Sequence, residues 1–218
     1  MKRSLYLVLS TLLLFVSTAG TAMAHITDAA NNPYHTAIEY VSDHKIMNGY
    51  EDHTFRPLGK VNRAELVKIL VSAKYSPDDL QNCTKDTSPA YLKLTDVHAT
   101  DWYAPALCVA YKNSFMKGYP DSTFRAGEYV TIAEAGKMMV QILGYGVKED
   151  PVEWYRPYLE KLEKLRALPK TLTYVTGTLT RADVAEMLYV ILDGQTGEYS
   201  ISINRLIINQ RLHDAGKM

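Results

Sequence analysis

The sequence predicts an all-α protein in which three helix–loop–helix repeats surround a shared central helical bundle with approximate threefold symmetry. Three observations predict this class. One segment recurs along the chain, each copy holds two stretches whose apolar residues are spaced by three and four, and a pair of short helices cannot bury its apolar face alone. The 218 residues are 47% apolar with balanced charges, which excludes disordered and collagen-like proteins.

Residues 1–24 predict a secretory signal peptide. Lys2 and Arg3 precede an apolar run at 5–16, and Ala22-Met23-Ala24 suits cleavage before His25. An uncleaved anchor is the alternative, but the run is shorter than the roughly 20 residues that span a bilayer. No second such run follows, so the mature chain is expected not to be transmembrane. It keeps 22 basic and 24 acidic side chains, a balance that disfavours nucleic acid as a partner.

An internal repeat at a constant offset of 69 residues defines the units. The turn Gly49–Arg56 recurs as Gly118–Arg125, and a degenerate third copy starts near Glu153 without this turn. Each copy is expected to form a helix, a turn, a loop and a second helix. The predicted boundaries are 32–76 for repeat 1, 77–93 for a linker, 94–146 for repeat 2, 150–194 for repeat 3 and 195–218 for a C-terminal tail.

The turn after each first helix carries a glycine and an aspartate. Gly49 and Gly118 are expected to adopt the left-handed conformation that ends a helix, because glycine does so most easily. Asp52 and Asp121 follow them. These loops lack the alternating ligands of a calcium-binding EF-hand, so we predict a structural turn and expect neither a metal nor a cofactor.

The second helix of each repeat begins with a capping box, in which a polar side chain precedes a carboxylate by three residues. This role explains the polar residue and the acid but not the residue between them. The three pairs are Asn62 with Glu65, Thr131 with Glu134, and Thr180 with Asp183.

Arg63 and Arg181 occupy the first turn of two of these helices, where the helix dipole disfavours a cation. A guanidinium beside the free amides of a helix start can hold a carboxylate or a phosphate. The alternative is an intramolecular partner, such as an acid in a loop of a neighbouring repeat. Ile132 takes the place of arginine in repeat 2, so that copy is not expected to bind an anion in this way.

Two further features concern aromatic and sulfur-containing residues. Trp102 and Trp154 lie at the starts of repeats 2 and 3, where they could stack on sugar faces or pack into the core. Cys83 and Cys108 are the only cysteines. In an exported protein they are expected to form a disulfide between the linker and a helix, with two free thiols as the alternative.

These residues resemble the S-layer homology domain, an exported triplicate module that fastens surface-layer proteins and exoenzymes to bacterial cell walls. The resemblance implies a ligand, secondary cell-wall polysaccharide with a negatively charged pyruvate ketal, bound in grooves between repeats. It gives Arg63 and Arg181 a ligand-binding role, and we add Glu65, Asp183 and the two tryptophans as candidates. Ile132 departs from the pattern, so fewer than three working grooves are expected. The motifs are Leu94-Thr95-Asp96-Val97, Asp101-Trp102-Tyr103-Ala104, Met116–Arg125 and Leu179–Asp183.

The function predicted from the sequence is therefore a non-catalytic anchoring module at the cell wall or cell surface. A glycan hydrolase is disfavoured because the acids at matching positions already have capping or turn roles. The main alternative is a structural or protein-interaction module with degenerate grooves. The tail could then contact another envelope protein, since Tyr199, Ile201 and Ile203 alternate like a strand and Leu206, Ile207 and Leu212 could form a helical face. Packing back onto its own bundle is the other possibility.

Overall fold

The computed structural model describes residues 26–85, 93–194 and 200–217. The predicted signal peptide and Tyr199 lie outside the described residues. Over the described part the elements are helices joined by loops and a few isolated β-bridges, which confirms the all-α prediction. The helices are α1 (His35–Asp43), α2 (Arg63–Ser72), α3 (Pro77–Thr84), α4 (Ala104–Lys112), α5 (Ile132–Ile142), α6 (Arg156–Lys164), α7 (Arg181–Asp193) and α8 (Ile203–Asp214).

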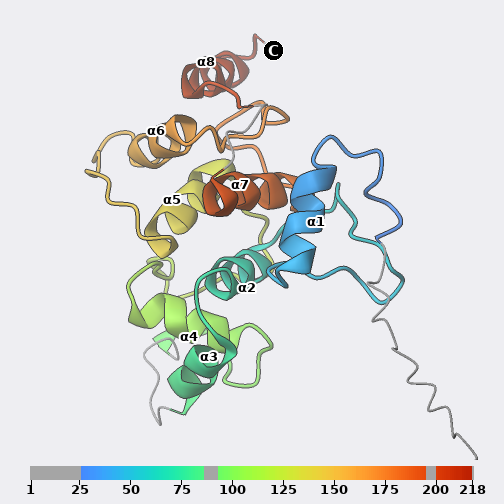
Figure 1. Ribbon diagram of the computed structural model, residues 1–218. Helices are drawn as coiled ribbons and strands as arrows, with labels where there is room; N and C mark the ends of the chain where they lie inside the picture. The colour runs from blue at the N-terminus through green and yellow to red at the C-terminus, as the bar shows by residue number, and fades with distance from the viewer. Residues whose placement is uncertain (1–25, 86–92, 195–199, 218) are drawn as a thin grey trace, which may run out of the picture.

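The helices pack in a cyclic order that joins different repeats. The first helix of each repeat packs against the second helix of another, as α1 does on α7, α4 on α2, and α6 on α5. Figure 1 shows α2, α5 and α7 toward the middle, with α1, α4 and α6 around them. Apolar residues of the outer helices, such as Ile38, Leu107 and Leu159, are fully buried. Each helix pair therefore completes its core with its neighbours' residues, as the short helices require.

Three backbone hydrogen bonds close a ring at the centre of the bundle. The amide of Val61 donates to the carbonyl of Leu179 (3.0 Å), that of Leu179 to Val130 (3.2 Å), and that of Val130 to Val61 (3.1 Å). All three residues are fully buried. Because each repeat donates once and accepts once, the ring places the three second helices about an approximate threefold axis.

The predicted capping boxes are all present. The side chains of Asn62, Thr131 and Thr180 accept from the backbone amide three residues later, and the acid at that position accepts from the capping residue's own amide. Two otherwise unpaired donors are satisfied at each helix start, and the starts of α2, α5 and α7 are held at the central ring.

The expected left-handed conformation of Gly49 and Gly118 is wrong. Lys45, Ser114 and Arg166 take the positive φ after the first helices, at 56°, 59° and 58°, and neither glycine does. Glycine is required at position 118 because there is no room for a side chain. A Cβ at Gly118 would lie 2.3 Å from Leu94 Cδ2 and 2.9 Å from the Thr123 carbonyl oxygen, distances that real Cβ atoms do not show.

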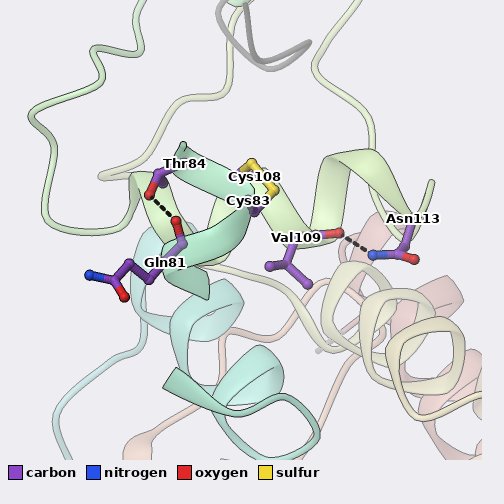
Figure 2. The surroundings of a disulfide bond; sticks show 6 residues. All are labelled: Gln81, Cys83, Thr84, Cys108, Val109 and Asn113. Carbon is purple, nitrogen blue, oxygen red and sulfur yellow. Dashed lines mark hydrogen bonds between the residues drawn. A yellow bond between two sulfur atoms is a disulfide. The ribbon is translucent and has the colours of Figure 1, made fainter. Parts of the chain in front are cut away.

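The segment predicted as a linker contains α3, which the sequence analysis did not foresee. Its start has a capping box of its own, formed by Ser76 and Asp79. Cys83 on α3 and Cys108 on α4 form a disulfide with Cα atoms 6.0 Å apart, as Figure 2 shows. The disulfide prediction is confirmed, and the alternative of two free thiols is wrong.

The C-terminal tail packs back onto the bundle. Its predicted strand is wrong where it can be checked, because Ile203 begins α8. The Ile201 amide donates to the Leu168 carbonyl (3.0 Å), and the Ile203 amide donates to Glu163 Oε1 (3.2 Å). The apolar face of α8, which contacts α6, is therefore used inside the chain. The buried tail residues are Ile201, Ile203, Leu206 and Ile207.

Candidate functional site

Arg63 reaches from the start of α2 in repeat 1 into the turn of repeat 2. Its Nε donates to the Phe124 carbonyl (2.8 Å), and its Nη1 lies 3.5 Å from Glu134 Oε1. The guanidinium also lies 4.7 Å from the centroid of the Tyr119 ring, an arrangement that favours a cation. Arg63 is only 6% exposed, so its position is fixed by the neighbouring repeat.

Arg181 makes the same connection between repeats 3 and 1. Its Nε donates to the Phe55 carbonyl and its Nη2 to the Asn48 carbonyl, both at 2.8 Å. The guanidinium lies 4.5 Å from the Phe55 ring centroid and 5.1 Å from that of Tyr50. Burial lowers the pKa of Arg181 from its usual value, but an arginine remains charged at neutral pH.

These contacts explain why a cation is tolerated at both helix starts. Carbonyl oxygens and aromatic faces of a neighbouring repeat offset the unfavourable dipole. An acid of a neighbouring repeat takes part for Arg63, through Glu134, whereas the hydrogen-bond partners found for Arg181 are carbonyls. The helix-start position by itself therefore does not require a ligand, and any binding role must rest on the space around each arginine.

Arg63 lines a groove of about 830 Å³ between repeats 2 and 3. We call it the Arg63 groove; its walls are the turn after α4, the exposed side of α5 and the start of repeat 3. Lys137 Nζ lies 3.6 Å from Glu149 Oε1 and 5.8 Å from the Trp154 ring centroid. Trp154 is 42% exposed. The charged and aromatic lining residues are Arg63, Phe115, Lys117, Tyr119, Glu134, Lys137, Glu149 and Trp154.

The charges in this groove leave a net positive value of one. Arg63 lies opposite Glu134, and Lys137 lies opposite Glu149. Lys117 also lines the groove and, among the described residues, forms no ion pair. The groove thus combines one uncompensated cation, a guanidinium fixed in position and an exposed aromatic face, which together suit a singly charged anion carried on a sugar.

The surroundings of Arg181, which come from repeats 1 and 2, resemble those of Arg63. We call them the Arg181 interface. The charge of Arg181 interacts with Glu65 and with the Tyr50 hydroxyl, as Arg63 interacts with Glu134 and Tyr119. The 69-residue offset puts Asn48 where the Arg63 groove has Lys117, so this second interface has one cation fewer. The residues at its matching positions are Asn48, Tyr50, Glu65, Lys68, Trp102 and Arg181.

The third interface lies around Ile132, between the loop of repeat 3 and the start of repeat 1, and it is distinct from the interface that holds Arg181. It has lost these features. Ile132 replaces the arginine, Glu186 replaces the lysine and Pro33 precedes Tyr34 where the others have tryptophan. Ile132 is fully buried, and burial raises the pKa of Glu186. This interface offers no comparable positive charge at these positions.

The predicted site residues do not all come together. Arg63 meets Glu134, which was predicted only as a cap, whereas Glu65 belongs with Arg181. Asp183 is 3% exposed, and its carboxylate accepts from the Thr180 amide and hydroxyl and from the Thr171 hydroxyl. It is fully engaged inside the protein.

Core packing, which is the more usual role of rings at helix starts and was expected for both tryptophans, is wrong. Trp102 is 61% exposed and Trp154 is 42% exposed. Each ring meets the following tyrosine edge-on, with interplanar angles of 85°. This edge contact orients each tryptophan while leaving surface area on its ring for a ligand.

Asp28 and Asp96 hold the turns in place, a role that was not predicted, although Asp96 belongs to the motif Leu94-Thr95-Asp96-Val97. The carboxylate of Asp28 accepts from the amides of Phe55 and Arg56 (2.7 and 2.9 Å), and that of Asp96 from Phe124 and Arg125 (both 2.7 Å). They therefore fix the turns whose carbonyls hold the two arginines. The signal was the match of Ile26-Thr27-Asp28 with Leu94-Thr95-Asp96, which is offset by 68 residues rather than 69.

Asp52 and Asp121 act within the turns, in accord with the predicted structural role. Each carboxylate accepts from the threonine two residues later and pairs with the arginine four residues later. Hydrogen bonds from Thr54 and Arg56 lower the pKa of Asp52 to about 2, and those from Thr123 and Arg125 do the same for Asp121. Both carboxylates are therefore ionised at neutral pH and engaged by their own turns.

Comparison with known proteins gives one family. The model of the S-layer homology domain matches residues 25–67 and 93–135. The chain is 31% identical over 145 residues, 66% of its length, to the middle cell wall protein of Brevibacillus brevis. It is 33% identical over 46% of its length to the surface layer protein of Brevibacillus choshinensis, and 28% identical over 50% to the cellulosome-anchoring protein of Acetivibrio thermocellus.

The chain matches only a small part of these relatives, covering 13%, 8% and 24% of their respective lengths. Within the part of the chain that the structure describes, no helix has the length and apolar character needed to cross a bilayer.

Proposed function

We propose that this chain is a non-catalytic S-layer homology module that anchors to the cell envelope by binding an acidic cell-wall polysaccharide. The match of residues 25–67 and 93–135 to the model of that domain supports the proposal. The relatives include a cell wall protein, a surface layer protein and an anchoring protein, which indicates a location at the cell surface. The proposed ligand carries a carboxylate on a sugar, such as a pyruvate ketal, and its main binding site is the Arg63 groove.

The observation that carries this proposal is the combination of a fixed guanidinium, an uncompensated lysine and an exposed indole in one groove. Arg63 is held by the Phe124 carbonyl through Nε, so little conformational entropy is lost when a carboxylate meets its remaining donors. Lys117 and Lys137 both act on a single carboxylate, that of Glu149, so one positive charge remains unbalanced in the groove. Trp154 offers an aromatic surface on which the apolar face of a sugar ring can stack.

The two remaining interfaces are not expected to bind an anion equally. At the Arg181 interface Asn48 replaces Lys117, but the matching residues there include only one acid, Glu65, against Arg181 and Lys68. The net charge is again plus one, so an anion is expected to bind at this interface too. At the third interface Ile132 and Glu186 replace the cations, and no anion binding is expected there. The proposal therefore has the Arg63 groove as its main site, a second anion-binding position beside Arg181, and a third interface that serves packing alone.

The test compares retention on native cell wall with retention on wall whose acidic substituents have been removed chemically. Removal should reduce retention strongly, and retention should fall as salt rises because partly exposed charges are screened. Unchanged retention after removal would exclude the acidic ligand and favour a module that contacts envelope proteins. Its surface would then lie outside the apolar face of α8, since that face is buried against the bundle.

The variant that tests the groove is Lys117→Gln combined with Lys137→Gln. These side chains are exposed or half-buried, so their loss should leave the fold intact. Arg63→Ala is a poorer test, because it also removes a hydrogen bond to the Phe124 carbonyl and is expected to lower stability. A matched control is Lys85→Gln with Lys112→Gln, which changes net charge equally on α4 and just after α3. Retention should fall about tenfold for the groove variant and stay unchanged for the control.

A further inference from the structure

A second cationic hollow lies outside the grooves between repeats. It has a volume of about 590 Å³ and is bounded by the connection 146–151 and by one side of α6. Glu149 lines both this hollow and the Arg63 groove, so the two depressions adjoin. We call it the α6 hollow; its charged lining residues are Lys148, Glu149, Asp150, Arg156, Glu160, Lys161 and Lys164.

The acids around the α6 hollow are engaged by the protein itself. The Glu149 carboxylate accepts from the Tyr158 hydroxyl (2.8 Å) and faces Lys137. Asp150 accepts from the amides of Val152 and Glu153. Glu160 lies 3.8 Å from Arg156. The negative charges at this site are thus directed to partners other than the three lysines of the hollow.

The lysines are not balanced in this way. Lys161 Nζ lies 4.5 Å from the Tyr145 ring centroid, and among the described residues Lys148, Lys161 and Lys164 form no ion pair. Lys161 and Lys164 are three residues apart on α6, so they share one face of the helix. The helix dipole stabilises positive charges in the last turn of α6, where Lys161 and Lys164 lie. This does not account for Lys148, which comes from the connection before α6.

The chemistry of the α6 hollow differs from that of the Arg63 groove. Its one guanidinium, Arg156, is paired with Glu153 and Glu160 and has its Nε bonded to Glu153. What remains is a set of ammonium groups, which can hold the oxygens of a phosphate as point charges, without the fixed fork of a guanidinium.

We propose that the α6 hollow binds phosphate groups of an anionic wall polymer linked by phosphodiesters. The choice of a wall polymer rests on the proposed anchoring function, since a phospholipid headgroup carries the same chemistry. A polymer bound in the hollow would continue past Glu149 toward the Arg63 groove, so that one module holds two kinds of anionic group.

The experiment measures binding of inorganic tripolyphosphate by calorimetry, using the mature chain with its disulfide intact. The test variant is Lys148→Gln, Lys161→Gln and Lys164→Gln together, and the control is Lys85→Gln, Lys112→Gln and Lys217→Gln, which removes the same charge elsewhere. The test variant should bind about tenfold more weakly and the control about as tightly as the unchanged protein. Equal affinity for all three proteins, or equal loss in both variants, would overturn the proposal.

Two further measurements keep the proposal testable if the triple variant fails to fold. Backbone amide shifts of the unchanged protein should respond to tripolyphosphate at 146–151 and 161–164, and a response confined to other residues would overturn the proposal. Vesicles of phosphatidylglycerol should not compete with a wall polymer that carries phosphodiesters; binding to vesicles but not to the polymer would overturn it in favour of a membrane surface.

The proposed function and this inference can fail separately. The variant Lys117→Gln with Lys137→Gln should lose retention on wall that carries carboxylates and keep tripolyphosphate binding. The α6 hollow variant should show the reverse pattern on isolated ligands. Loss of tripolyphosphate binding in the groove variant alone would place the phosphate in the Arg63 groove and reject the α6 hollow.

Discussion

Leu94 occupies the space that a side chain at Gly118 would need. A Cβ added at Gly118 would lie 2.3 Å from Leu94 Cδ2, and also 2.9 Å from the carbonyl oxygen of Thr123. Leu94 belongs to the segment that carries Asp96, and Gly118 belongs to the turn that Asp96 holds. The close approach of these two segments is therefore part of what positions the Phe124 carbonyl beneath Arg63.

Gly118→Ala should lower the free energy of unfolding by about 1–3 kcal/mol, because the backbone oxygen of Thr123 cannot move aside as easily as a flexible side chain. Urea denaturation checks the value. Gly127→Ala is the matched control, since nothing lies within 4 Å of the added Cβ, and it should be nearly neutral. Equal free energies of unfolding for the two variants would mean that the turn can shift to accommodate the added Cβ without loss of stability.

Asp96→Ala should lower the free energy of unfolding by about 1–3 kcal/mol, because two backbone amides lose their acceptor. Asp28→Ala should have a similar effect in repeat 1. Thermal unfolding and wall retention should be measured together, since the Asp96 variant disturbs the turn that holds Arg63. Asp78→Ala on α3, an exposed acid, is the control. A stable Asp96 variant with normal retention would contradict the supporting role.

Reducing the Cys83–Cys108 bond, or replacing both cysteines with serine, should destabilise the protein by about 2–4 kcal/mol. The bond closes a loop with a sequence separation of 25 residues, which restricts the unfolded chain. Hydrogen exchange should then increase in α3 first, because α3 is attached mainly to α4. Binding to the wall should persist at low temperature, since neither cysteine lines the Arg63 groove. Loss of binding without unfolding would contradict this separation.

The turns should lose part of their stability in acid. Hydrogen bonds lower the pKa of Asp52 and Asp121 to about 2 in the folded protein, below the value near 4 of an unfolded chain. A lowered pKa means that the folded state favours the ionised form. The resulting stabilisation is present above about pH 4 and is lost as the pH falls through about 2.

The measurement is a comparison of unfolding midpoints for the unchanged protein and for Asp121→Asn. The gap between them should be largest above about pH 4 and should close toward pH 2. Titration of the two carboxyls by NMR gives the pKa values directly. A gap that stays constant with pH would show that the ionised side chain is not what stabilises the turn.

Much of the fold could be predicted from the repeat and its apolar spacing. These patterns placed the first and second helices of the repeats, the capping boxes and the fully buried residues of α1 and α4, because such features depend on neighbours along the chain. The disulfide followed from a single pair of cysteines in a chain expected to be exported. The helix α3 was not predicted, although Ser76, Pro77 and Asp79 form a recognisable helix start inside the supposed linker.

The site was predicted only in part. Arg63 and Arg181 were found as unusual residues at helix starts, but the sequence did not predict which acid and which tryptophan lie beside each of them. Glu65 lies with Arg181, and Arg63 lies with Glu134 and near Trp154. A capping acid and the arginine beside it point to different interfaces, and local sequence cannot show which interface each one reaches.

The sequence by itself determined the repeats, the helix starts and the presence of cations where a helix dipole disfavours them. The tertiary structure decided which repeat each cation serves, and it did so through the ring of backbone bonds among Val61, Val130 and Leu179. The ring brings the start of each second helix beside the turn of a different repeat. Arg63 therefore contacts the turn of repeat 2, and Arg181 contacts the turn of repeat 1. Interactions within a helix are set by residues three or four apart, whereas a groove depends on contacts between residues separated by more than 60 positions.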